Sequence, residues 1–158
     1  MRFICPLLVV KDMERFKAFY QTVLHRRVLA DLGANVTMEG PFALQTEESW
    51  LAFTGLQAEQ ICYGGCQSEL YFESEDLDGF LERLRFYGEG SYVHSAKQMP
   101  WGQRVIRFYD PDDHIIEVGE PMHAVVKRMQ AQGLSLEEIA ARTMTPPEVL
   151  KQYAEENA

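Results

Sequence analysis

Hydrophobic positions follow a pattern that occurs twice along the chain. "CPLLVVKDMERFKAFYQTVL" begins at Cys5 and "ELYFESEDLDGFLERLRFYG" begins at Glu69. Each copy opens with a short apolar run, which predicts a strand. Apolar residues then recur three and four positions apart, which predicts an amphipathic helix. Aligning Asp12 with Asp76 superimposes the two copies, and each aspartate stands where the N-cap of the helix is expected.

Short strand-like segments, separated by turn residues, follow each predicted helix. They cover Arg27–Asp31, Asn35–Met38 and Phe42–Thr46 in the first copy, and Ser91–Ser95, Arg104–Tyr109 and His114–Val118 in the second. Each copy is therefore predicted to be a β-α-β-β-β module. The modules cover about residues 1–50 and 67–120, and a linker with several glycines joins them over roughly Leu51–Gln67.

Residues 121–158 are predicted to form a helical extension to this two-module domain of residues 1–120. One helix covers Met122–Gln132 and is closed by Gly133. A capping box at Ser135 opens a second helix, and another at Thr145 opens a third with Pro146 at its first position. The apolar side chains available for burial there are Val125, Val126, Met129, Leu136, Ile139, Val149, Leu150 and Tyr153.

Composition narrows the class of protein. The 158 residues are 46% hydrophobic, as in a globular domain, and the net charge of −9 argues against nucleic acid or an anionic membrane as partner. No apolar run approaches the roughly 20 residues of a membrane span. The apolar run at the N-terminus reaches Lys11 and Asp12 too soon for a signal peptide, so we expect a cytoplasmic protein.

Three cysteines, an odd number, argue against a disulfide framework. The segment "CYGGC", from Cys62 to Cys66, has the wrong spacing for a zinc knuckle and no second pair nearby. We interpret these two residues as partly buried thiols beside a Gly-Gly turn.

The segments "LLVVKDMERFKAFY" and "WGQRVIRFYDPDDHIIEV", together with the duplication, make the chain resemble the vicinal oxygen chelate superfamily. This superfamily includes glyoxalases, bleomycin-resistance proteins, extradiol dioxygenases and methylmalonyl-CoA epimerases. The resemblance covers residues 1–120. It implies an α+β fold in which paired βαβββ modules form curved sheets around a cleft, often completed by a dimer partner, so we expect a homodimer. Members usually have glycine where Asp113 stands, and aspartate tolerates the same left-handed turn.

The resemblance also implies where a metal would bind. Metal-binding members take four ligands from one inward-facing position on the first and last strand of each module. Those positions hold Cys5, Gln45, Glu69 and Glu117. Cys5 and Glu69 stand where members usually have histidine. The assignment of Gln45 depends on the alignment, because a shift of one residue would replace it with Leu44 or Thr46. This set could hold a divalent metal such as zinc. With all four histidines elsewhere, it argues against an extradiol dioxygenase, whose iron needs two of them.

Glu69 and Glu117 stand out even without a metal. The duplication predicts both on the cleft side, where two carboxylates without a cation repel each other and one pKa rises. They are then a metal pair, a catalytic acid–base pair or an anchor for a cationic ligand, unless both simply face solvent in a wide cleft. Cys5, by contrast, also fits an ordinary core position.

Four aromatic residues are candidates for ligand binding, although each fits a hydrophobic core equally well: Trp101, Phe42, Tyr71 and Phe108.

Two functions follow from the resemblance. The first is a glyoxalase- or bleomycin-resistance-like protein that binds a small molecule in the cleft without a catalytic metal, and the altered histidine positions favour it. The alternative is a metal-dependent lyase or isomerase of the glyoxalase or epimerase type with a non-standard ligand set, which Glu69 and Glu117 favour.

Overall fold

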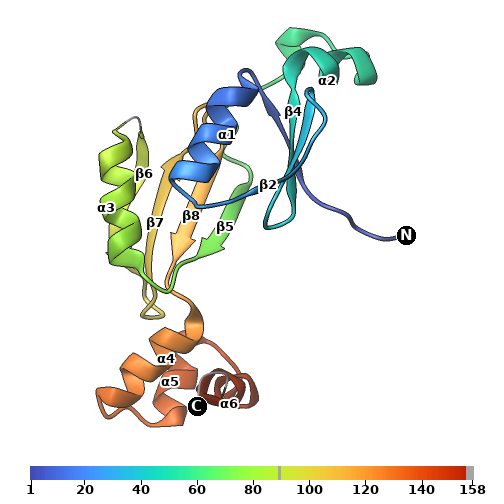
Figure 1. Ribbon diagram of the computed structural model, residues 1–158. Coiled ribbons are helices and arrows are strands. Elements are labelled where there is room, and N and C mark those ends of the chain that lie inside the picture. Colours follow the sequence, from blue (N-terminus) through green and yellow to red (C-terminus); the bar gives the residue numbers. More distant parts are fainter. Residues whose placement is uncertain (89, 156–158) are drawn as a thin grey trace. The chain divides into compact units, whose positions relative to one another are not determined.

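The computed structural model describes residues 1–88 and 90–155 and contains two four-stranded mixed sheets with helices, so the predicted α+β fold is confirmed (Figure 1). The first sheet has the strand order β1-β4-β3-β2. Its strands are β1 (Leu7–Val10), β2 (Val28–Asp31), β3 (Asn35–Met38) and β4 (Phe42–Thr46). β1 pairs with β4 in parallel, and the two other pairs are antiparallel.

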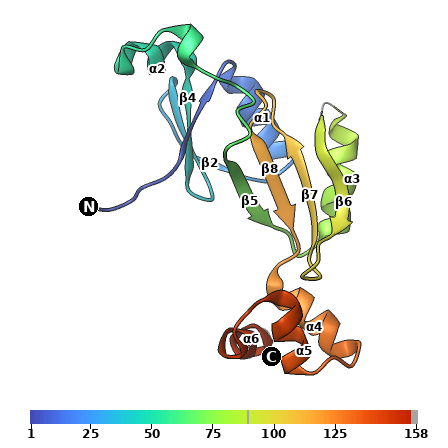
Figure 2. The same cartoon turned by 180° about the vertical axis from the view of Figure 1, so that it is seen from behind.

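The second sheet repeats this topology with the order β5-β8-β7-β6, which can be followed in Figure 2. Its strands are β5 (Glu69–Glu73), β6 (Tyr92–Gln98), β7 (Arg104–Tyr109) and β8 (Ile115–Gly119). In both sheets the first strand of the repeat pairs with the last. The duplication found in the sequence therefore extends to the pairing of the strands.

Each repeat places its helix directly after its first strand. These helices are α1 (Met13–Thr22) and α3 (Leu77–Tyr87). The carboxylate of Asp12 accepts a hydrogen bond from the Arg15 amide at 3.0 Å, and that of Asp76 accepts one from the Gly79 amide at 2.9 Å. Both helices thus begin where the two aligned aspartates predict.

The linker contains a helix that the sequence analysis missed, α2 (Glu47–Thr54). It follows β4 without a loop and has no side-chain hydrogen bond at its N-cap, Thr46. Gly55 ends it in the left-handed conformation with φ of 74°. Because α2 has only eight residues, its hydrophobic pattern is too short to be distinguished from a turn-rich linker.

The chain divides into two compact units, each built from separate stretches. The first contains residues 1–68, 83–91 and 109–115, and the second contains residues 69–82, 92–108 and 116–158. In the first unit, α1 buries Phe16, Phe19 and Tyr20. The Tyr20 hydroxyl donates to the Asp110 carboxylate at 3.1 Å, so the turn between β7 and β8 is part of this core.

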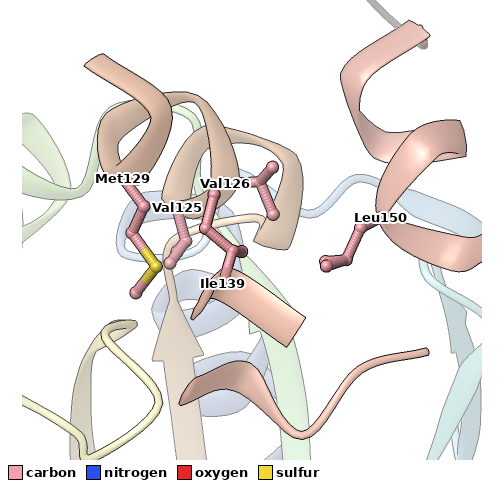
Figure 3. Packing of buried hydrophobic residues seen from close by; sticks show 5 residues of the cluster. All are labelled: Val125, Val126, Met129, Ile139 and Leu150. Atoms are coloured by element: carbon pink, nitrogen blue, oxygen red, sulfur yellow. The ribbon is translucent and has the colours of Figure 1, made fainter. Parts of the chain in front are cut away.

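The second unit includes the predicted helical extension. It forms α4 (Met122–Ala131), α5 (Leu136–Thr143) and α6 (Pro147–Glu155), and the capping box at Ser135 is present. The third helix begins at Pro147, one residue later than predicted, and the Thr145 hydroxyl, which was expected to cap it, donates to the Thr143 carbonyl at 3.3 Å. Buried side chains from all three helices form one cluster, shown in Figure 3: Val125, Val126, Met129, Ile139 and Leu150.

Gly102, in the turn between β6 and β7, lies directly beneath α4. A Cβ atom there would lie 2.1 Å from the terminal methyl of Met129, and the φ of Gly102 is +91°. Arg128 of α4 adds a hydrogen bond to the Gly102 carbonyl at 2.7 Å. The extension is therefore packed against the second sheet. Among the described residues, every helix is too short or too polar to cross a lipid bilayer.

Candidate functional site

A cluster of polar side chains crosses the second sheet, with one residue from each strand. Arg107 of β7 lies at its centre and donates through Nε to Glu69 of β5 at 2.8 Å. Its Nη2 forms an ion pair with Glu117 of β8, and its Nη1 lies 3.4 Å from Nε2 of His94 on β6. We call these four residues the Arg107 cluster.

The Arg107 cluster lies on the face of the sheet that α3 does not cover. Phe108, next to Arg107 in β7, is fully buried, and its ring centre lies 5.9 Å from that of Phe80 in α3. Successive strand residues point to opposite faces, so Arg107 points away from α3. Ile116 and Val118 are likewise buried on either side of Glu117. Glu117 interrupts an apolar strand because it faces an arginine on the neighbouring strand.

Burial makes this pairing necessary for Glu117. Its side chain is 7% exposed, while that of Arg107 is 23% exposed and that of Glu69 is 37% exposed. An unpaired charge so deeply buried would cost several kcal/mol. The guanidinium offsets this cost and separates the two carboxylates, which would otherwise repel each other.

Gln45, the predicted ligand of the first module, is buried on β4 with its side-chain amide satisfied by its neighbours. Its Oε1 accepts from the Asn35 amide at 2.7 Å, and its Nε2 donates to the Ser49 hydroxyl. Cys5 precedes β1, and its thiol is free. Val9 lies opposite Gln45, so Cys5 is four residues, or roughly 13 Å, away along the strand direction.

The four predicted metal ligands do not fit one metal site in this structure. Zinc ligands lie about 2.0–2.3 Å from the ion, whereas Cys5 and Gln45 are separated by several times that distance. Glu69 and Glu117 do come together, but a guanidinium already lies between them. Within the described residues, no group of three or more His, Cys, Asp or Glu side chains is arranged to hold a metal ion.

Two of the four aromatic candidates are buried in hydrophobic cores. Phe42 is 1% exposed, with its ring centre 4.9 Å from that of Tyr20. Phe108 packs against Phe80 on the opposite face from Arg107. Both lie on buried strands whose inward residues cover a helix, and the sequence pattern does not distinguish that face from a ligand-binding one.

Tyr71 is half exposed and lies two residues after Glu69 on β5, on the same face. Its hydroxyl donates to Glu73 at 2.8 Å and accepts from Gln103 at 2.9 Å. Burial of the ring and the hydrogen bond to Glu73 raise the pKa of Tyr71 to about 12. The indole of Trp101 donates to Gln103 at 2.9 Å, so the buried Gln103 links the two aromatic residues.

Sequence reasoning missed Arg107, His94 and Gln103. For Arg107 the missing information is the register of the hairpin formed by β7 and β8. The Asp110 amide donates to the His114 carbonyl, and the Glu120 amide donates to the Arg104 carbonyl, a register that sets Arg107 directly opposite Glu117. A hairpin that pairs Tyr109 with His114 around the predicted turn would instead have set Arg107 opposite Ile116, so the observed register has to be known before Arg107 and Glu117 are paired. No sequence signal marks His94 or Gln103.

Comparison with known proteins identifies the family. The family model described as a glyoxalase-like domain matches residues 3–123. A comparison with curated proteins finds no match. A protein of unknown function from Agrobacterium tumefaciens str. C58 is 38% identical, with a TM-score of 0.70, over 77% of this chain and 94% of that one.

Two further solved structures are similar. A glyoxalase/bleomycin resistance protein/dioxygenase from Nocardioides is 25% identical, with a TM-score of 0.61, over 76% of this chain and 83% of that one. The fosfomycin resistance protein FosX from Listeria monocytogenes shares the fold at 22% identity, with a TM-score of 0.57, over 77% of this chain and 93% of that one. The paired modules and the match over residues 3–123 show that the chain belongs to the glyoxalase-like domain family of the vicinal oxygen chelate superfamily.

Proposed function

We propose that the protein binds a small molecule on the open face of the second sheet, and that Arg107 takes the place that a catalytic metal has in other family members. The observation that carries this proposal is the guanidinium held between Glu69 and Glu117. It supplies the positive charge that two neighbouring carboxylates require. A metal ion at the same place would have to displace a partly buried, hydrogen-bonded arginine.

The chemistry of this face favours a ligand with a positive charge or several hydrogen-bond donors. With His94 neutral, the Arg107 cluster carries two negative charges and one positive charge. Glu69 is the more exposed of its two carboxylates and is the one that a ligand would reach. Tyr71 offers a half-exposed ring beside it, on which an apolar or cationic part of the ligand would lie. Two of the compared proteins carry names that refer to antibiotic resistance, which agrees with ligand binding.

Metal content and an Arg107 variant test the proposal. Protein purified without a metal-binding tag should contain no stoichiometric divalent metal, and zinc, nickel or manganese should not raise its melting temperature. Arg107→Ala should lose about 3–5 kcal/mol of stability at neutral pH, because Glu117 is left buried without its partner. Lowering the pH or adding a divalent cation should restore part of this loss.

Arg85→Ala, which removes an exposed guanidinium near the end of α3, is the matched control and should change little. One metal ion per wild-type chain, lost in Glu117→Gln, would overturn the proposal. That result would favour the alternative, a metal-dependent lyase or isomerase. The alternative requires Arg107 to leave the carboxylates and Cys5 to approach Gln45.

We also propose that the protein is a homodimer. Phe3, Ile4 and Leu7 are exposed in and just before β1, which is an edge strand of its sheet and pairs with β4. Exposed apolar side chains on a free strand edge favour association with another chain. Light scattering at micromolar concentration should give the mass of two chains, and Phe3→Ser with Ile4→Ser should shift it towards one. A single-chain mass for the wild type would contradict the proposal.

A further inference from the structure

A pocket lies within the first compact unit and shares no residue with the Arg107 cluster. Its volume is about 160 Å³, and the linker and the turn between β7 and β8 form its walls. A site for a drug-sized ligand usually measures at least about 300 Å³. The pocket therefore admits only a few atoms, such as the reactive end of a small molecule. The residues that line it are Cys62, Gly64, Gly65, Cys66, Gln67, Ser68, Asp113, His114 and Ile115.

Two cysteines with free thiols line this pocket, and Tyr63 and a glycine pair separate them along the chain. Cys62 and Cys66 are both exposed, and Gly64 and Gly65 between them carry no side chain that would screen the sulfur atoms. Gly64 has a φ of +71°, and a Cβ atom there would lie 3.4 Å from the Cβ of Asp113. Glycine thus allows the linker to turn tightly against the β7–β8 turn, which carries His114.

The imidazole of His114 is held in one orientation. Its Nδ1 lies 2.9 and 3.0 Å from the two carboxylate oxygens of Asp110, whose side chain is fully buried. The ring also makes edge contacts with Phe16 and Tyr63. Since a carboxylate only accepts hydrogen bonds, Nδ1 of the neutral ring carries the proton. Nε2 is then the basic nitrogen that remains for the pocket, as in sites where a third group orients a base beside a nucleophile.

We propose that Cys62 and Cys66 form a dithiol site that exchanges with small disulfides, and that His114 acts as its base. Cys66 is the first nucleophile, because its sulfur lies 3.9 Å from the Tyr109 hydroxyl, which can donate to a developing thiolate. The Cys66 thiol gives its proton to Nε2 of His114, and the thiolate attacks one sulfur of the disulfide RSSR. A Cys66–S–S–R bond forms, the original S–S bond breaks, and the leaving thiolate takes the proton from His114.

The thiol of Cys62 completes the exchange. It loses its proton in the same way and attacks the Cys66 sulfur, which releases the second RSH and closes a Cys62–Cys66 disulfide. Two protein thiols are oxidised, and one small disulfide is reduced to two thiols. A tight turn at residues 62–65 brings Cys62 and Gly65 within about 7 Å of each other, and Cys66 is the next residue along the chain.

The test treats the full-length chain with hydroxyethyl disulfide, an uncharged probe that the net charge of −9 does not repel. Intact mass and the number of free thiols are followed over time. Two of the three thiols should disappear together, leaving a chain that is lighter by two hydrogens and carries no attached group. Cys62→Ser should stop at a mixed disulfide on Cys66, while Cys5→Ser, the matched control, should still form the internal disulfide.

The role of His114 has a separate readout in the pH dependence. His114→Asn keeps a donor for Asp110 but has no nitrogen at the Nε2 position. Its exchange should be roughly tenfold slower or more at pH 7 and should approach the wild-type rate above about pH 8.5, where an ordinary thiol ionises unaided. Should this variant fail to fold, the wild-type rate alone decides, since exchange should already be fast at pH 7, where a thiol of ordinary pKa is largely protonated. Equal, independent labelling of all three cysteines, or a His114→Asn rate equal to wild type at every pH, would overturn the proposal.

Discussion

Glu120, one residue after β8, and Arg128 of α4 form a paired ionic contact through two parallel hydrogen bonds. Nη1 donates to Oε1 at 2.8 Å and Nη2 donates to Oε2 at 2.9 Å. Arg104 of β7 adds its Nε at 2.8 Å and its backbone amide at 3.0 Å. Burial opposes ionisation of Glu120, but the hydrogen bonds from Arg128 and Arg104 outweigh it and hold the pKa of this carboxyl group below its ordinary value of 4.5.

Glu120→Gln should therefore be less stable than the wild type at pH 7, by about 1.5–3 kcal/mol for hydrogen bonds to a charged group. A lowered pKa in the folded protein contributes stability above the ordinary value of 4.5, and this contribution is lost as the pH falls through the folded-state pKa. Urea unfolding at several pH values should show the difference from wild type shrinking below about pH 4.5. Glu137→Gln, on the exposed first turn of α5, is the control. A difference that stays constant down to pH 3 would contradict this account.

Glu69→Gln should slightly destabilise the protein, by about 0.2–1 kcal/mol, because Glu69 is a half-exposed partner of Arg107. If the two carboxylates faced each other without a cation, the same change would relieve repulsion and stabilise the fold. Because Glu69 is paired with Arg107, we expect the substitution to destabilise the fold instead. Melting temperatures at pH 7 test this prediction. A higher melting temperature for Glu69→Gln than for the wild type would show that Arg107 does not neutralise the two carboxylates in solution.

Removal of residues 121–158 should lower the melting temperature without unfolding the family domain. α4 packs Val125 and Met129 against Gly102 of the turn between β6 and β7, and the shortened chain loses this contact. The extension also supplies Arg128 to Glu120. Circular dichroism during heating should show one transition at a lower temperature. An unchanged melting temperature would mean that α4, α5 and α6 are an independent appendage.

Gly102→Ala tests the contact between α4 and the turn that joins β6 to β7. The new methyl group would collide with Met129, and alanine is strained at a φ of +91°. We expect a loss of about 1–2 kcal/mol from the backbone and a smaller addition from crowding, because the atom that the new methyl group meets is the flexible end of the Met129 side chain. In the chain shortened to residue 120 only the backbone part should remain. Equal losses in the two chains would show that Met129 moves aside at no cost.

Local sequence signals were sufficient for most elements of the fold. The strands Asn35–Met38, Phe42–Thr46 and Arg104–Tyr109 have the predicted bounds, because turn residues separate each from its neighbours. The first strand starts two residues after Cys5, since Pro6 cannot donate a backbone hydrogen bond to a sheet.

The candidate site was harder to predict, because it depends on pairing between strands. The sequence marked Glu69 and Glu117 as unusual, but the alternatives considered were a metal ion, a cationic ligand, an acid–base pair or solvent, and not an arginine of the same sheet. Arg107 becomes their partner only when β5, β8 and β7 are placed side by side in the observed register. Register is set by side-chain packing over the whole sheet and by turn geometry, neither of which a single segment contains.

The three separate stretches that make up the first compact unit have a consequence for synthesis of the chain. A ribosome adds about 5–20 residues per second, so Tyr20 emerges roughly 5–18 s before Asp110, which follows it by 90 residues. The Lys11 amide likewise lacks its hydrogen-bond acceptor until the carboxylate of Asp112 has been synthesised. During that interval the first repeat carries a buried phenol without its acceptor. A gene fragment ending after the first repeat would thus encode an incomplete core, and the duplication does not divide the protein into halves that fold alone.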